Sequence, residues 1–231
     1  RAKRVVSPAG AFGRFGVYAA DPDDWACEAR RYYFNIVGKY GNQVQAVLKK
    51  AAALDIKTIC PLHGPVLAEN LGYYIDKYNT WSSYTPEDKG VLIAFGTMHG
   101  NTAKAAEVLK QKLTAAGVEK VVVSDLVRDD MAEVIEDAFR YDRMVIMAPT
   151  YDAGLFPAME DFLNHLKAKN YCNRKVGIVE NGTWAPMAAK KMAEIVSTFK
   201  NVTLAETVVT IKSALNADSE AVLDKLVAEL A

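Results

Sequence analysis

Short apolar runs alternate with longer stretches of helical periodicity from Gly90 to the C-terminus. The apolar runs predict five β-strands, at residues 91–95, 120–124, 144–148, 175–180 and 206–211. The stretches between and after them predict helices at residues 102–116, 130–141, 158–169, 187–199 and 219–230. Strands and helices that alternate through short connections are typical of parallel βαβ units. With right-handed crossovers, the pattern predicts an α/β sandwich of three layers.

A polar segment that contains Pro86 and Gly90 precedes this region and predicts a domain boundary. One unit is expected at residues 1–84 and another at residues 85–231. The first unit predicts helices at 25–37 and 43–54, a short strand at 57–60 and a loop at 61–65. Because it contains so few strands, it is thin for an independent core, and we expect it to pack on the second unit or on another chain.

The charge balance narrows the classes of partner. Lys and Arg together number 28, as do Asp and Glu, so no net charge argues for nucleic acid or an anionic membrane surface. No apolar run approaches the ~20 residues of a membrane span, and the N-terminus lacks the apolar stretch of a signal peptide. We therefore expect no membrane and no nucleic-acid partner.

The cysteines indicate a cellular compartment, and the first residues indicate that the sequence is part of a longer chain. Three cysteines, Cys27, Cys60 and Cys172, are too few and too widely spaced for a disulfide framework, which indicates the reducing cytoplasm. Residues 1–4 contain no initiator Met and lead into a strand-like pattern, so we expect a fragment of a longer chain.

The connection after the first predicted strand has the composition of a phosphate-binding loop. It contains Thr97, Met98, His99, Gly100, Asn101 and Thr102, directly before a predicted helix. Loop amides, the helix N-terminus and two Thr hydroxyls can bind a phosphate without Lys or Arg, and a protonated His99 would add a charged donor. A nucleoside triphosphate loop needs Lys and Ser or Thr after its second glycine, and a dinucleotide loop needs three spaced glycines. Neither is present, although an ordinary βα turn remains an alternative for this loop alone.

Two further loops should reach the same edge of the sheet, because ligands bind beyond the carboxyl ends of parallel strands. The first contains Pro149, Thr150, Tyr151, Asp152, Ala153, Gly154 and Phe156, and the second contains Asn181, Gly182, Thr183, Trp184, Ala185 and Pro186. Tyr151 and Trp184 are candidate apolar faces for a planar ring. Gly154 and Gly182 would let backbone amides approach the ring edge, with positive φ angles if required. The three loops together predict a flavin mononucleotide (FMN) site.

The chain resembles the C-terminal part of flavodiiron proteins, also called A-type flavoproteins. The resemblance is carried by residues 11–13 (Ala-Phe-Gly), 28–33, 61–65 and the three loops above. It implies the end of a metallo-β-lactamase-like α+β domain, followed by a flavodoxin-like domain whose five strands lie in the order 2-1-3-4-5. It further implies FMN as cofactor, rubredoxin or a similar protein as electron donor, and a head-to-tail homodimer.

The other half of that family is a diiron centre that reduces dioxygen or nitric oxide. By resemblance, His63 matches its last His ligand, whereas the other ligands fall before residue 1. Gly10 stands where the family has the Asp that bridges the irons. One imidazole cannot hold two irons, so we expect the diiron site to be incomplete in this chain and the chain to be the electron-transfer half. A plain turn histidine remains an alternative for His63.

The same fold also serves other functions. Response regulators need acidic residues at the ends of the first and third strands, and this chain has Phe95-Gly96 and Ala148-Pro149 there. A stand-alone flavodoxin-type quinone reductase that uses a nicotinamide cofactor is an alternative, against which residues 1–84 argue. A binding module without redox chemistry is a further alternative.

Overall fold

The computed structural model describes residues 22–231, with side chains from Trp25 onward. Gly10 and the Ala11–Gly13 motif lie outside the described residues. The chain divides into two compact units, Arg1–Thr85 and Pro86–Ala231, and each is described by itself.

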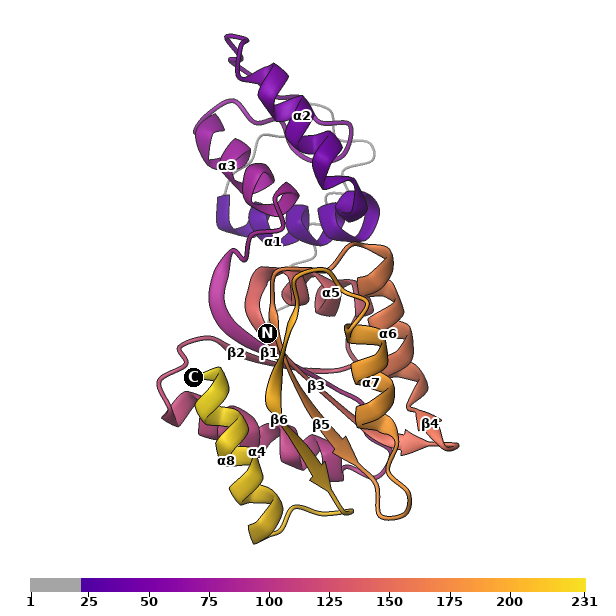
Figure 1. The fold of residues 1–231 in the computed structure, drawn as a ribbon. Coiled ribbons are helices and arrows are strands. Elements are labelled where there is room, and N and C mark those ends of the chain that lie inside the picture. Colours follow the sequence, from indigo (N-terminus) through magenta and orange to yellow (C-terminus); the bar gives the residue numbers. More distant parts are fainter. Residues whose placement is uncertain (1–21) are drawn as a thin grey trace. The chain divides into compact units, whose positions relative to one another are not determined.

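The second unit is built on a parallel sheet (Figure 1). Its strands are β1 (Asp88–Phe95), β2 (Val121–Asp125), β3 (Tyr141–Tyr151), β5 (Lys175–Asn181) and β6 (Thr203–Ile211). They lie in the order β2-β1-β3-β5-β6, and every neighbouring pair on this path is parallel. The predicted α/β fold and its strand order 2-1-3-4-5 are therefore confirmed.

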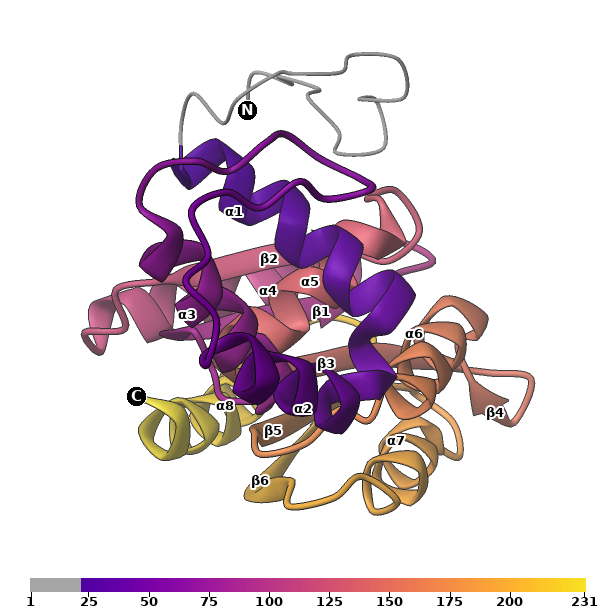
Figure 2. The same ribbon diagram turned by 90° about the horizontal axis from the view of Figure 1, so that it is seen from above.

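Helices cover both faces of this sheet, as Figures 1 and 2 show. They are α4 (Asn101–Ala115), α5 (Met131–Arg140), α6 (Pro157–Ala168), α7 (Ala188–Val196) and α8 (Ala217–Leu230). Side chains of α4 and α8 bury Val91, Ile93 and Phe95 of β1 on one face. Leu92 and Ala94 point to the other face and are also fully buried. Burial on both faces explains why the strands are continuous apolar runs.

Local sequence sets the starts of two helices. The Asp130 side chain accepts a hydrogen bond from the Ala132 N–H and caps α5. Asn216 and Ser219 form a reciprocal capping box at the start of α8.

The structure corrects two details of the second unit. Residues 150–155 form a short antiparallel hairpin, in which β4 (Gly154–Leu155) pairs with the end of β3. Its two turn residues, Asp152 and Ala153, both have positive φ, at 47° and 54°. A two-residue hairpin of type I′ requires positive φ at both turn residues, and the glycine that usually marks such a turn is missing here. Tyr141, predicted to end a helix, instead begins β3 directly after α5.

An ionic cluster joins the start of β1 to its neighbours. The Asp88 carboxylate accepts hydrogen bonds from Lys120 Nζ and Arg140 Nε, both at 2.7 Å. Partial burial acts to raise the pKa of Asp88, but these two cations outweigh it and hold the pKa below its usual range.

The described part of the first unit is largely helical. It contains α1 (Pro22–Tyr32), a π-helical turn (Tyr33–Val37), a 3-10 turn (Gly38–Tyr40), α2 (Gly41–Ala51) and α3 (Leu71–Ser82). The strand predicted at 57–60 is wrong: only an isolated bridge between Ile59 and Leu67 forms there. Helix α3 was not predicted. It packs through Tyr74, Tyr78 and Trp81 against Trp25 of α1.

Candidate functional site

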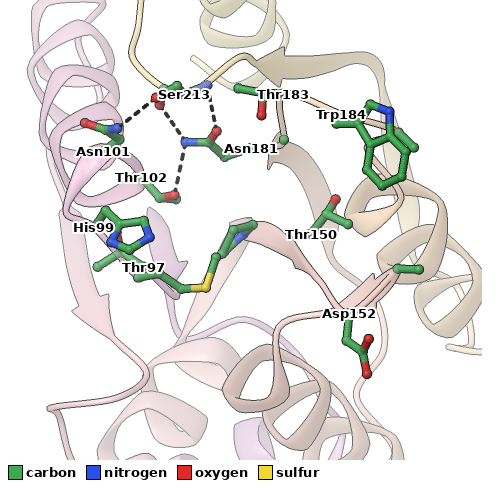
Figure 3. A pocket seen from close by; sticks show the side chains of 15 residues that line it. Thr97, His99, Asn101, Thr102, Thr150, Asp152, Asn181, Thr183, Trp184 and Ser213 are labelled. Atoms are coloured by element: carbon green, nitrogen blue, oxygen red, sulfur yellow. Dashed lines mark hydrogen bonds between the residues drawn. The ribbon is translucent and has the colours of Figure 1, made fainter.

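The loops that follow β1, β3, β5 and β6 enclose a cavity of ≈ 580 Å³ at the carboxyl edge of the sheet (Figure 3). This volume lies in the range of about 300–1,000 Å³ that is typical of small-molecule sites. The cavity is lined by Thr97, Met98, His99, Asn101, Thr102, Pro149, Thr150, Asp152, Ala153, Asn181, Gly182, Thr183, Trp184, Ala185 and Ser213.

All three loops chosen from the sequence contribute to this lining. Five of the predicted residues do not line it: Gly100, Tyr151, Gly154, Phe156 and Pro186. One lining residue, Ser213, was missed. It lies two residues beyond β6, and the available signal was that the last strand also ends at this edge.

The loop after β1 brings a helix N-terminus to the cavity. Helix α4 starts at Asn101, and its N-cap Gly100 has a φ of 84°, which favours glycine. The Thr97 hydroxyl accepts a hydrogen bond from the Gly100 N–H at 3.0 Å. The first turn of a helix leaves its N–H groups without intrahelical acceptors, so this end of the cavity is rich in donors.

Phe156 supports this loop from outside the cavity. A Cβ atom built on Gly96 would lie 2.4 Å from Cδ1 of Phe156, so the ring packs on the bare backbone where β1 ends. Tyr151 meets the same ring edge-to-face, with 6.2 Å between centroids. The Phe156 ring thus connects the end of β3 to the loop after β1. Only a glycine at position 96 lets the ring come this close to the backbone.

The loop after β3 is held by Thr150. Its hydroxyl accepts hydrogen bonds from the Met187 N–H at 2.8 Å and the Ala188 N–H at 3.2 Å, at the start of α7. Thr150 also lies close to Gly182, where a Cβ atom would be 3.3 Å from the hydroxyl oxygen and 3.1 Å from Cβ of Pro186. A side chain at position 182 would thus crowd both Thr150 and Pro186, and Gly182 lets the two loops pack closely.

Positive φ angles occur around the cavity, but not at the glycines expected. Gly154 and Gly182, where the sequence allows such angles, do not adopt them. They occur instead at Asp152, Ala153, Ala185 and Ser213, with φ of 47°, 54°, 44° and 72°. Such conformations cost roughly 1–3 kcal/mol each in residues other than glycine and cluster at ligand sites.

A network of side-chain hydrogen bonds joins the loops after β1, β5 and β6 (Figure 3). The Asn181 amide donates to the Ser213 C=O at 2.9 Å, and the Asn181 side-chain oxygen accepts from the Ser213 N–H at 3.1 Å. The same amide reaches the buried Thr102 hydroxyl at 3.5 Å. Asn101 donates to the Ser213 hydroxyl at 3.3 Å. Asn181 therefore fixes Ser213 on both sides of its α-carbon.

The two ends of the cavity differ in chemistry. Hydroxyl and amide groups gather beside α4, whereas Trp184 lies at the opposite side in Figure 3. Trp184 is 89% exposed and Met98 is 46% exposed, so apolar surface borders the opening. Within the described lining, only His99 and Asp152 have ionisable side chains. A ligand with an anionic end and a planar apolar end would fit this arrangement.

A family model described as a flavodoxin domain matches residues 92–213, which include all four loops. The chain belongs to the flavodoxin domain family. This domain runs from β1 to Ser213, and it therefore contains every residue that lines the cavity.

Several sequence relatives have the names of oxidoreductases. A nitric oxide reductase of Moorella thermoacetica is 31% identical over 186 residues, covering 78% of this chain and 45% of the relative. A coenzyme F420H(2) oxidase of Methanothermobacter marburgensis is 26% identical over 147 residues, covering 62% of this chain and 36% of the relative. The chain spans less than half the length of these curated relatives.

Solved structures of flavodiiron proteins are similar to this chain in fold. The flavodiiron protein of Giardia intestinalis matches with a TM-score of 0.85 at 20% identity, covering 94% of this chain and 55% of that one. The resemblance to flavodiiron proteins stated from the sequence is thus confirmed.

His63 belongs to the first unit, Arg1–Thr85. Its ring is 5.4 Å from that of Tyr32, and it borders a cavity of ≈ 220 Å³ with aromatic walls. In the part of the chain that the structure describes, no three His, Cys, Asp or Glu side chains gather as a metal site would require. Nor does any described helix have the length and apolar character needed to cross a membrane.

Proposed function

We propose that this chain binds FMN and transfers electrons through it. The proposal rests on the cavity at the carboxyl edge of the sheet in the flavodoxin domain. One end of this cavity has neutral hydrogen-bond donors, and the other end has the exposed indole of Trp184. Bound FMN would supply one- and two-electron redox chemistry, and the protein would supply binding, orientation and electrostatics.

The phosphate would be held at the end of the cavity beside α4. Thr97 and Thr102 offer hydroxyl donors there, and the helix N-terminus offers backbone N–H groups. No Lys or Arg lines the cavity in the described chain, so neutral groups would supply most of the donors to the anion. His99 lines this end as well and would add a positive charge when protonated.

The ring would be held at the opposite end, against Trp184. This indole is too exposed to be part of a core, and a planar ligand would cover its face. Asp152, Ala153 and Ala185, which also line the cavity, have the strained backbone that is common at ligand sites. This end would therefore orient the ring and exclude water from one face.

At the level of the whole protein, we propose the electron-transfer half of a flavodiiron oxidoreductase that reduces dioxygen or nitric oxide. The similarity to a nitric oxide reductase and to flavodiiron folds supports this class. A solved structure titled rubredoxin oxygen:oxidoreductase, from Desulfovibrio gigas, has a TM-score of 0.84 at 20% identity and spans 94% of this chain and 55% of its own. It supports rubredoxin as the class of electron donor. We further propose that the protein forms a head-to-tail homodimer in the cytoplasm. In a complete diiron centre, His63 would be one of the iron ligands.

Titration of the cofactor-free protein with FMN tests the site. We expect one FMN per chain, with quenching of flavin fluorescence by the indole, and a yellow protein after gel filtration. Trp184→Ala should weaken FMN binding at least tenfold, because it removes the apolar face at the ring end. Tyr40→Ala serves as the control, since Tyr40 is an exposed aromatic side chain in the other unit. A folded protein that does not bind FMN at micromolar concentration would contradict the proposal.

A further inference from the structure

Four hydroxyl groups of the cavity share one constraint. Each accepts a hydrogen bond from an N–H group that can only donate: Thr97 from Gly100, Thr150 from Met187 and Ala188, Thr102 from Asn181, and Ser213 from Asn101. An N–H group directed at a hydroxyl oxygen occupies a lone pair and turns the O–H proton away. These four hydroxyls are therefore free to act as donors, which suits a ligand that only accepts hydrogen bonds.

Ser213 joins this set from a loop that belongs to none of the three flavin loops predicted from the sequence. Its backbone N–H and C=O both bond to the Asn181 side chain, which is 9% exposed and firmly packed. Ser213 itself adopts a left-handed conformation with a φ of 72°. Its hydroxyl is thus held in place beside Asn101 and Thr102, at the α4 end of the cavity and away from Trp184 (Figure 3).

We propose that Ser213 is a fourth-loop anchor for the phosphate of FMN and that it sets the preference for the phosphate ester over riboflavin. This inference rests on the proposed function. The Asn101 amide donates to the Ser213 oxygen, and Ser213 in turn donates its proton to a phosphate oxygen. A fully deprotonated phosphate offers only acceptors, so it matches Thr97, Thr102 and Ser213 together. Riboflavin ends in a hydroxyl and gains less from the same donors.

Binding of FMN and riboflavin to the wild-type chain and to Ser213→Ala tests the inference. We expect the affinity for FMN to fall about tenfold, as for a lost hydrogen bond to a charged group, while the affinity for riboflavin changes less than twofold. Ser213→Gly removes the same hydroxyl but accepts the left-handed conformation without strain, so it separates loss of the hydroxyl from distortion of the loop. Ser197→Ala, at the exposed C-terminal end of α7, is the matched control.

The outcomes are distinct. A tenfold drop in the ratio of FMN affinity to riboflavin affinity for both Ser213 variants supports the anchor. An unchanged ratio, or an equal loss for both ligands in Ser213→Gly, overturns it while leaving the proposed function intact. If the wild-type chain binds neither ligand, the proposed function fails and the anchor fails with it. Urea unfolding of each variant shows whether the fold is retained.

Discussion

At the scale of single residues, the shape of the site depends more on side chains packed closely against glycine backbone than on charged groups. Gly96 and Gly182 each leave room for a neighbouring side chain that ties two loops together. The strained positions, by contrast, are Asp, Ala and Ser, whose conformations the surrounding contacts must enforce. Close packing and local strain therefore shape a cavity whose own side chains carry little charge.

Gly96→Ala tests whether the contact with Phe156 supports the site. The new methyl group would overlap the Phe156 ring, so the loop after β3 must shift. We expect a loss of about 1–3 kcal/mol in the free energy of unfolding and a clear loss of FMN affinity. Urea denaturation and FMN titration measure the two effects.

Gly72→Ala is the matched control, because nothing lies within 4 Å of a Cβ atom at that helical position. It should keep FMN affinity and slightly raise stability. If the two variants have the same FMN affinity and stability, the contact between Gly96 and Phe156 does not support the site.

The sequence identified most of the cavity lining because strand order brings the ends of parallel strands to one edge. It did not identify Ser213, because a lone Ser after the last strand carries no local signal. Tyr151 and Phe156 were also expected in the lining, but they do not line the cavity. The turn at Asp152 and Ala153 forms a hairpin that the sequence did not indicate. Whether the lining residues bind FMN stays a prediction.

At the scale of elements, the ends of the parallel strands opposite the cavity are held by polar contacts. Arg174, which is 3% exposed, donates to the backbone C=O groups of Phe139, Tyr141 and Cys172. It thereby joins the end of α5, the start of β3 and the segment before β5. Burial lowers the pKa of its guanidinium, yet an arginine remains charged.

Edge strand β6 shows the same use of a polar side chain. Its pairing with β5 is irregular between Val176 and Ile178, and the N–H groups of Glu206 and Thr207 bond to the Glu229 carboxylate of α8. Hydrogen bonds from Thr207 and Glu206 hold the pKa of Glu229 below its usual range. At this bulge, the N–H groups of β6 therefore find their acceptor on a helix, α8, and not on the neighbouring strand.

Asp88→Asn should show how much the cluster at the start of β1 contributes. The folded-state pKa of Asp88 is lowered, so its stabilisation is present above the unfolded pKa of about 3.9 and is lost as pH falls through the folded pKa. We expect the variant to be about 1 kcal/mol less stable at pH 7, because the charges are partly exposed. The difference from wild type should shrink as the pH is lowered below about 4.

Urea unfolding at several pH values checks this. Asp55→Asn is the control, since Asp55 and Lys57 form an ion pair in which both side chains are at least 80% exposed. That variant should match wild type at every pH. A pH-independent loss in Asp88→Asn would instead indicate that geometry, and not charge, holds the cluster.

At the scale of the whole molecule, the two units differ in how far their sequence revealed them. In the second unit, strands buried on both faces are continuous apolar runs, and they alternate with amphipathic helices. In the first unit, α3 carries its buried face on Tyr74, Tyr78 and Trp81, and aromatic residues have only modest helix propensity. Packing against Trp25 determines that helix, and a local pattern cannot indicate such packing.

Because every residue that lines the cavity belongs to Pro86–Ala231, this unit should bind FMN without the first. Its sheet is covered on both faces by its own helices, so a protein of residues 86–231 should fold cooperatively. We expect its FMN dissociation constant to agree with that of the full chain within about threefold, or roughly 0.7 kcal/mol. Isothermal titration of both proteins measures this, and Trp184→Ala in the short protein should reproduce the loss seen in the full chain. A short protein that unfolds in one urea transition yet binds FMN much more weakly would mean that residues 1–85 contribute to the site.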